Sequence, residues 1–371
     1  MGTTTFQIAV LPGDGIGQEI MPVCLEVLAA AERNVGGFRL NPEVLPGGAA
    51  YYREHGIAMT DADYRRTGEA DAILFGAMGL PDVRYPDGTE IAPHLQMRVD
   101  YGLYAGVRPV RSFPNLPGPL ADPRASQIDL IVLRESSEGL FFSRGKGTVE
   151  DDRIARETMV ITRETSERLF DFAFNLARRR QERRGTPGRV TCVDKSNVFV
   201  AMAFFRKIFD ERAKRFPDIK ADHHYVDATA LDLVRRPWDF DVLVMENMFG
   251  DILSDLAGGL VGSMGLAACA EVGDNHALFQ PAHGSAPDIA GRGIANPIAM
   301  ILSAAMMLEW LGQRHGVAAA CDAALLIERS VERGLAERRI RPREFGGDQT
   351  TVDIGREVAA GLERCKTIAG A

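Results

Sequence analysis

The chain has 371 residues, of which 46% are hydrophobic and 25% are charged, and its formal net charge is −8. This composition is close to the average of globular proteins and excludes a disordered chain, which would contain fewer apolar residues. The length allows one large domain or two domains of medium size. Because nucleic-acid-binding proteins usually present a basic field, the negative charge argues against a nucleic-acid partner.

The cysteines and the apolar runs indicate where the protein works. The five cysteines lie far apart, and no two of them form a C-x-x-C pair: Cys24, Cys192, Cys269, Cys321 and Cys365. This spacing argues against a disulfide framework or a thiolate zinc site and favours a reducing compartment. The amino-terminal residues run directly into a strand pattern, so we expect no signal peptide. The longest apolar run, residues 298–308, is about half of the ~20 residues that a membrane span needs, so we expect a cytoplasmic protein without a membrane partner.

In chain order, short runs rich in Val, Ile and Leu alternate with longer helical patterns. The expected strands are residues 6–11, 70–75, 128–133, 189–193 and 241–245. Expected helices cover residues 18–33 and 163–184. Continuous apolar runs suit strands that are buried on both faces. The alternation of strands and helices therefore indicates an α/β fold with a largely parallel sheet.

Two segments stand apart from this alternation. Arginines gather at the end of the helix expected over residues 163–184. They could form an anion site, but we interpret them as solvated, because basic residues favour helix C-termini. Residues 142–162 alternate charged and β-branched residues without an apolar face, and we expect an excursion that pairs with a partner subunit.

The stretch from residue 247 to residue 256 carries two aspartates directly after an expected strand. If a helix begins near Gly250, Asp251 and Asp255 are four residues apart and share one face. Two carboxylates placed in this way repel each other unless a cation lies between them, and oxygen ligands suit Mg²⁺ or Mn²⁺. The alternative is one aspartate that caps the helix and a second that is solvated. On this stretch alone the two interpretations are level.

Two further polar residues favour the metal site. Lys195 follows the strand expected over residues 189–193, and Asp227 lies in residues 223–230 at what we interpret as a further strand end before a helix. In an open α/β sheet, the carboxyl ends of the strands line the ligand crevice. A single lysine or aspartate at such a position is usually just exposed, but several together indicate a site.

Three arginines form a second candidate set. Arg108 ends the apolar run 103–107, Arg134 ends the strand expected over 128–133, and Arg98 lies ten residues before Arg108. Guanidinium groups bind carboxylates through two parallel hydrogen bonds. If the three converge beside a divalent cation, they make a pocket for a small polycarboxylate. Taken singly, each arginine could be an ordinary surface residue.

Two glycine-rich segments are candidates for contact with a nucleotide. Residues 283–297 are rich in Gly, Ala and Ser, which lets backbone approach a ligand closely, although a plain loop would have the same composition. Asp288 could accept hydrogen bonds from ribose hydroxyls and would repel a 2′-phosphate. Residues 13–17 fail the dinucleotide fingerprint, which requires glycine where Gln18 stands, so we reject a Rossmann interpretation.

These motifs resemble those of the β-decarboxylating dehydrogenases, the family of the 3-isopropylmalate, isocitrate, tartrate and D-malate enzymes. The resemblance covers nearly the whole chain, and its most specific parts are residues 247–255 and 283–297. It implies an isopropylmalate-dehydrogenase-like α/β sandwich of two domains with a large twisted mixed sheet, and a homodimer with shared active sites. The implied domains are residues 1–103 plus 262–371 on the cofactor side, and residues 104–261 for substrate, metal and dimerisation.

The resemblance also implies a role for each candidate residue. Arg98, Arg108 and Arg134 would hold the carboxylates of a hydroxy-dicarboxylate substrate. The ligands of Mg²⁺ or Mn²⁺ would be Asp227, Asp251 and Asp255. Lys195 and Asp227 would be catalytic and would reach in from the second subunit. The residues that would contact NAD are His283, Gly284, Ser285, Ala286, Asp288, Ile289 and Asn296. The implied reaction oxidises a (2R)-malate-type acid with β-decarboxylation.

Three positions depart from the family pattern. Phe141 stands where the family has a tyrosine that protonates the enol, and Gln280 stands where glutamate is common. His94 interrupts the apolar residues that read the C3 substituent, so we expect a small or polar substituent rather than isopropyl. Because of Phe141, a non-catalytic binding protein on the same scaffold is an alternative, as is a different metal-assisted reaction.

Overall fold

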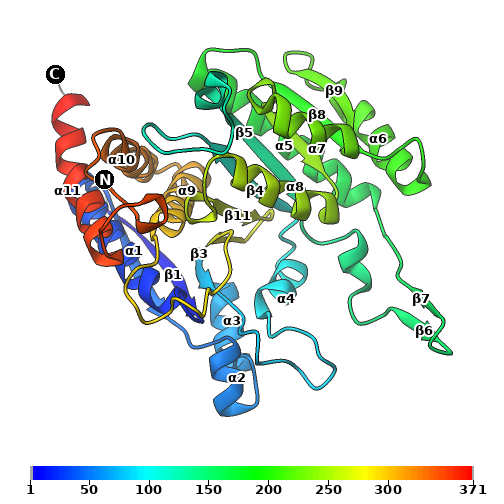
Figure 1. The fold of residues 1–371 in the computed structure, drawn as a ribbon, viewed down its shortest axis with the longest axis horizontal. Coiled ribbons are helices and arrows are strands. Elements are labelled where there is room, and N and C mark those ends of the chain that lie inside the picture. Colours follow the sequence, from blue (N-terminus) through cyan, green and yellow to red (C-terminus); the bar gives the residue numbers. More distant parts are fainter. Residues whose placement is uncertain (1–2, 370–371) are drawn as a thin grey trace.

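The fold is one long twisted sheet with helices on both faces (Figure 1). It is known from a computed structural model that describes residues 3–369. The strands are β1 (Thr4–Gly13), β2 (Phe38–Val44), β3 (Ala72–Ala77), β4 (Ala105–Arg111), β5 (Asp129–Glu135), β6 (Thr148–Glu150), β7 (Ile154–Arg156), β8 (Arg189–Asp194), β9 (Lys220–Tyr225), β10 (Val242–Met245), β11 (Ala268–Val272) and β12 (Ala277–Pro281). The α-helices are α1 (Gly17–Val35), α2 (Ala49–His55), α3 (Asp61–Glu69), α4 (Pro93–Asp100), α5 (Arg163–Arg184), α6 (Val200–Ala213), α7 (Val226–Arg235), α8 (Asn247–Leu260), α9 (Ile298–His315), α10 (Ala318–Ala336) and α11 (Thr351–Ala369).

The main sheet has ten strands in the order β2-β1-β3-β12-β11-β4-β5-β10-β8-β9. Pairing is parallel in both outer parts, but β11 and β4 pair antiparallel with each other and with their outer neighbours. The expectation of a largely parallel sheet from strand–helix alternation therefore holds only for the outer parts. The mixed sheet implied by the family resemblance is confirmed, as is the absence of a Rossmann arrangement.

The strand order separates the sheet into two groups of five. Strands β1, β2, β3, β11 and β12 lie on one side, and β4, β5, β8, β9 and β10 lie on the other. The two groups meet at the antiparallel pair of β11 with β4. The grouping corresponds to the expected segments 1–103 plus 262–371 and 104–261, although their behaviour as two domains stays a prediction.

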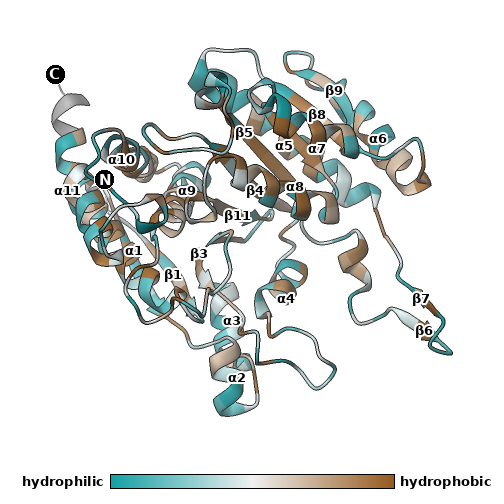
Figure 2. Ribbon diagram, viewed as in Figure 1, coloured by the Kyte–Doolittle hydropathy of each residue, from teal (hydrophilic) through white to brown (hydrophobic). Residues whose placement is uncertain are grey.

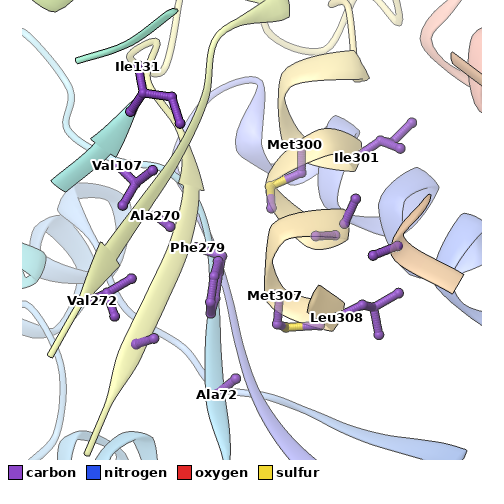
Figure 3. Close-up of a cluster of buried hydrophobic side chains, with 14 of the residues drawn as sticks. Ala72, Val107, Ile131, Ala270, Val272, Phe279, Met300, Ile301, Met307 and Leu308 are labelled. Carbon is purple, nitrogen blue, oxygen red and sulfur yellow. The ribbon is translucent and has the colours of Figure 1, made fainter. Parts of the chain in front are cut away.

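Apolar packing joins the helices to both groups of strands. Figure 3 shows α9 presenting Met300 and Met307 toward Phe279 of β12 and toward side chains from the antiparallel strands, whereas Ile301 and Leu308 point to the other side of the helix. Figure 2 colours each residue by its hydropathy. The central strands are apolar, and the helices are hydrophilic on their outer sides. Successive side chains of a strand point to opposite faces of the sheet. The strand residues next to those that pack against α9 therefore point to the other face.

Two predicted boundaries on the site side of the sheet are wrong by a few residues. Helix α8 begins at Asn247 rather than near Gly250, because Glu246 caps it by accepting hydrogen bonds from the backbone N–H groups of Met248 and Phe249. Strand β4 continues to Arg111, so Arg108 lies within it rather than at its end. The backbone of Arg108 still pairs antiparallel with β5, so the charged side chain does not end the strand.

The arginines at the end of α5 are not simply solvated, which corrects our sequence interpretation. Arg180 and Arg184 both bind the carboxylate of Asp241, and Arg178 pairs with Asp218. These contacts connect α5 to the strand layer beneath it. The cluster therefore has its own anionic partners within the chain and is not an anion site waiting for a ligand.

Residues 142–162 form the expected excursion. Strands β6 and β7 make a two-stranded hairpin that extends away from the body of the molecule (Figure 1). All six strand residues are exposed, including Val149 and Ile154. Glu138 binds both the backbone N–H and the hydroxyl of Thr162, which fixes the two ends of the excursion together.

Two remaining expectations concern cysteines and membranes. The described cysteines are all free, and none of them forms a disulfide. Over the part of the chain that the structure describes, no helix combines the length and apolar character of a membrane span.

Candidate active site

The three arginines come together on the face of the sheet opposite α9. Arg108 and Arg134 stand on the neighbouring strands β4 and β5, and Arg98 comes from the last turn of α4. Their side chains are 9%, 3% and 6% exposed, respectively. Burial, with the positive charges of Arg98 and Arg108 adding to it, lowers the pKa of Arg134 to about 10. Crowded and desolvated cations of this kind favour an anion between them.

Helix α8 places its two aspartates beside these arginines. Asp251 forms an ion pair with Arg134, and an oxygen of Asp255 lies 3.8 Å from a guanidinium nitrogen of Arg108. Both carboxylates remain substantially exposed on one face of the helix. The partial burial that Asp255 does have raises its pKa, and the neighbouring charge of Asp251 adds to the rise against the opposing effect of Arg108. Two mutually repelling oxygen donors at this spacing fit Mg²⁺ or Mn²⁺.

Asp227 and Lys195 form a separate pair. The ammonium group of Lys195 lies 2.6 Å from a carboxylate oxygen of Asp227, at the point where β8 and β9 give way to their following segments. Lys195 holds the pKa of Asp227 below its usual value through this hydrogen bond. Within the described part of one chain, no three His, Cys, Asp or Glu side chains gather in a metal-binding group. A single chain therefore does not bring Asp227 together with Asp251 and Asp255.

His94 faces the arginines as a neutral ring. Its imidazole packs against Phe75 with ring centroids 5.2 Å apart, and its buried Nδ1 has no hydrogen-bond partner among the described residues. Burial, together with the nearby positive charges of Arg98, Arg144 and Arg134, lowers the pKa of His94 to about 3. The ring can thus offer a neutral polar atom at physiological pH.

We expect His94→Asn to flatten the loss of stability in acid. The unfolded chain protonates histidine near pH 6.5 and the folded chain only near pH 3, so between these values the unfolded state binds more protons and stability falls with acidification. Removing the group should reduce this fall by about 3 kcal/mol in urea unfolding measured from pH 7 to pH 4. The exposed His55 supplies the control His55→Asn, which should leave the profile unchanged. Equal profiles for His94→Asn and the parent protein would contradict the argument.

Phe141 lies where its ring faces Arg134. It belongs to a short 3-10 helix over Leu140–Ser143, and its ring centroid is 5.1 Å from Cζ of Arg134. The position is therefore at the edge of the arginine cluster. A phenyl ring offers no transferable proton, so proton donation at this point of the cluster requires another group.

The predicted cofactor loop connects β12 to α9 and is held by the glycine-rich opening of the chain. The backbone N–H of Ile16 donates to the carbonyl of Ser285 over 2.9 Å. Gly15 has a positive φ, and a Cβ there would lie 2.1 Å from that carbonyl oxygen. The carboxylate of Glu19 accepts hydrogen bonds from the backbone N–H groups of Gly291 and Gly293. The loop is thus fixed in place by α1 rather than being free.

The remaining predicted cofactor residues divide into supporting and exposed groups. Asn296 is buried, and its oxygen accepts a hydrogen bond from the N–H of Ile298 in the first turn of α9. His283 has its Nδ1 bonded within the loop and its buried Nε2 unpartnered among the described residues. Asp288 and Gly284 are exposed, whereas Ala286 and Ile289 are partly exposed. An unpartnered ring nitrogen and an exposed carboxylate beside open backbone fit the hydroxyl and amide groups of a dinucleotide.

The glycine-rich opening itself has a structural role that our sequence reading missed. Asp14 is buried, and its carboxylate accepts hydrogen bonds from the backbone N–H groups of Ala49, Ala50 and Gly79, each over 2.8 Å. The carboxylate of Asp14 therefore occupies the space within this turn and accepts the hydrogen bonds of the surrounding backbone. The rejection of a phosphate-binding fingerprint here agrees with this arrangement.

Three further residues of the site were not predicted. Asn247 accepts hydrogen bonds from Nε and Nη2 of Arg134, and Ser254 accepts one from Arg108. Glu271 is fully buried and lies 2.7 Å from Arg98. Asn247 and Ser254 belong to the stretch singled out for its aspartates. The signal for Glu271 was a lone acidic residue inside the apolar run 268–272.

Comparison with known proteins gives the class. Residues 7–358 match the family model described as isocitrate/isopropylmalate dehydrogenase, and the chain belongs to this family. Membership makes it a dehydrogenase of hydroxy acids that uses NAD and Mg²⁺ or Mn²⁺, which confirms the family predicted from the sequence.

Similar proteins cover nearly the whole chain. It is 42% identical over 368 residues to a 3-isopropylmalate dehydrogenase of Desulfotalea psychrophila, with 96% of this chain and 99% of that protein covered. It is 39% identical over 354 residues to a 3-isopropylmalate/3-methylmalate dehydrogenase of Methanocaldococcus jannaschii, with 95% and 98% covered. The crystal structure of an isocitrate dehydrogenase from Methylococcus capsulatus superposes with a TM-score of 0.84 at 34% identity, covering 96% and 99% of the two chains.

Proposed function

We propose that this dehydrogenase oxidises, with β-decarboxylation, a (2R)-malate-type acid that carries a small or polar C3 substituent. The observation that carries the proposal is the convergence of three buried guanidiniums with the carboxylates of α8. One relative is named for both 3-isopropylmalate and 3-methylmalate, so the scaffold accommodates C3 groups of different sizes. The neutral ring of His94 beside the arginines favours the smaller or more polar group.

The arginines would bind and orient the substrate's two carboxylates. Asn247 and Ser254 fix the directions of Arg134 and Arg108, so little side-chain entropy is lost when the anion binds. Asp251 and Asp255 would hold Mg²⁺ or Mn²⁺ with Asp227. When bound, the divalent ion would supply Lewis acidity for the substrate's oxygens, and NAD would supply the hydride acceptor.

Lys195 and Asp227 would help to remove the proton of the C2 hydroxyl. Their contact of 2.6 Å lets Asp227 accept a proton while the ammonium group stabilises the negative charge that develops nearby. We propose that a second copy of the chain contributes this pair, making a homodimer with shared active sites. The separation of Asp227 from the α8 carboxylates in one chain and the protruding β6–β7 hairpin support this arrangement.

The cofactor would bind along the loop from His283 to Asn296. Asp288 is exposed and would accept hydrogen bonds from the ribose hydroxyls of NAD. We further propose that residues 1–103 plus 262–371 form the cofactor-side domain and residues 104–261 the substrate, metal and dimerisation domain. The free cysteines support a cytoplasmic location.

A panel of hydroxy acids tests the proposed function. (2R)-malate, tartrate, isocitrate and 3-isopropylmalate are each supplied with NAD⁺ and Mn²⁺, and NADH absorbance is followed. We expect malate or tartrate to give a higher kcat/KM than 3-isopropylmalate. Clearly best turnover of 3-isopropylmalate would overturn the substrate assignment. Thermal stabilisation by these acids without turnover of any of them would favour the binding-protein alternative raised by Phe141.

We expect Phe141→Tyr to keep the enzyme active and to raise kcat by about 2- to 10-fold, because it adds an acid beside Arg134. Steady-state kinetics and the solvent isotope effect measure the change, which should be confined to kcat. The adjacent Phe142 is exposed, and Phe142→Tyr serves as the matched control. Complete inactivation of a well-folded Phe141→Tyr variant would contradict the placement of this ring.

A further inference from the structure

Glu271 is a buried carboxylate at the base of the arginine cluster. It lies on β11, and its oxygen Oε1 is 2.7 Å from Nη2 of Arg98 and 4.0 Å from Nη2 of Arg108. Its side chain is 0% exposed, and Oε2 has no hydrogen-bond partner among the described residues. A buried charge with incomplete pairing lowers the stability of the fold. We therefore expect Glu271 to have a role in the site.

The sheet register puts Glu271 in the same row as Arg134. Glu271 pairs with Gly106 of β4, and Gly106 pairs with Arg134 of β5. Gly106 leaves the space between them open, since a Cβ there would lie 2.9 Å from Oε2 of Glu271 and 2.5 Å from Oγ of Ser136. The absence of a side chain at residue 106 thus makes room for the carboxylate within the arginine cluster.

Glu271 changes the net positive charge that the arginine cluster offers to the substrate. The three guanidiniums carry three positive charges, and Glu271 removes one of them from the cluster. The charges of Asp251 and Asp255 would be balanced by a divalent cation. Two positive charges then remain for the substrate, which equals the charge of a dicarboxylate. Without Glu271 the same cluster would match a tricarboxylate.

We propose that Glu271 is a specificity-determining residue that selects hydroxy-dicarboxylates over hydroxy-tricarboxylates. It does so by neutralising one guanidinium charge and by occupying Nη2 of Arg98, which is then not available to a third carboxylate. The inference rests on the proposed function and deepens it, because the family includes enzymes named for substrates of both kinds. Glu271 is a positioning residue, since it acts through the arginines rather than on the reacting atoms.

Binding of inert anions tests the selection without turnover. The probes are succinate and propane-1,2,3-tricarboxylate, each titrated by calorimetry into the full-length protein in the presence of Mn²⁺. We expect the parent protein to bind succinate at least as tightly as the tricarboxylate. Glu271→Gln keeps the shape and removes the charge, and it should shift the affinity ratio toward the tricarboxylate by about tenfold. Glu271→Asp keeps the charge and should preserve the preference for succinate.

The control and the contrary outcomes separate selection from folding. Glu309 is a partly buried carboxylate on α9, on the other face of the sheet, and Glu309→Gln should leave the ratio unchanged. An unchanged ratio in folded Glu271→Gln overturns the proposal. Tighter tricarboxylate binding by the parent protein overturns it as well, even if the variant fails to fold. Failure of every hydroxy acid to reduce NAD⁺ would refute the proposed function instead, because the calorimetric ratio is measured without turnover.

Discussion

Asp251→Asn should reduce kcat/KM by about 10³-fold, equivalent to about 4 kcal/mol of lost transition-state stabilisation. The substitution removes one negative charge from the pair on α8 and weakens the proposed ligand set for Mg²⁺ or Mn²⁺. The Mn²⁺ concentration that gives half-maximal activity should rise by at least about 100-fold. Activity measured across a Mn²⁺ titration gives both values.

A matched aspartate separates loss of the metal from loss of an ion pair. Asp239 is exposed and pairs with Arg236 at 3.5 Å, so Asp239→Asn also breaks an aspartate–arginine contact. This control should leave the Mn²⁺ titration unchanged, and thermal unfolding should show that both variants fold. If Asp251→Asn gives the parent titration curve, Asp251 is not a metal ligand.

Lys195→Met should lower kcat by about 10³-fold with a smaller change in KM, because the group acts on a proton rather than on substrate affinity. The loss should also move the acid limb of the pH profile. Lys195 holds the pKa of Asp227 below its usual value, so its removal lets that pKa rise. We therefore expect activity to fall at a higher pH in the variant than in the parent enzyme.

The control for this prediction is Lys207 on α6. Lys207 is exposed and lies outside the proposed site, so Lys207→Met should leave kcat and the pH profile unchanged. A purely structural effect of Lys195→Met would lower the amount of folded enzyme without moving the acid limb. An unmoved limb would mean that Lys195 does not control the ionisation of Asp227.

The sequence predicted strands β1, β3, β5, β8 and β10 of the main sheet, but it missed the edge strand β2 and the middle strands β11 and β12. Strand β10 is a continuous apolar run that is buried on both faces, and β8 is also buried over most of its length, with valines and a cysteine around Thr191. Strand β4 carries Arg108 within its span, and its pairing depends on β5 and β11. A charged residue on a strand that faces a ligand site interrupts the apolar pattern, so strand length was underestimated there.

The sequence predicted those site residues whose type and spacing indicate their chemistry. Asp251 and Asp255 are recognisable because carboxylates four residues apart on a helix need a counter-charge. Glu271 was missed because its partners Arg98 and Arg108 are more than 160 residues away in sequence, and only the strand order brings them together. The relation of Asp227 to the other aspartates was likewise inferred from family resemblance, since no spacing within one chain encodes it.

The division of the sheet also constrains how the protein can be made. Strand β3 pairs with β12, and α1 packs in the same apolar core as α9 and α10, so the first part of the chain depends on partners near its end. During synthesis, residues 104–261 can complete their five strands while β1–β3 still await β11 and β12. We conclude that Arg98 can meet Glu271 only after the ribosome has delivered the chain through residue 271, so the anion pocket cannot assemble before β11 has been made.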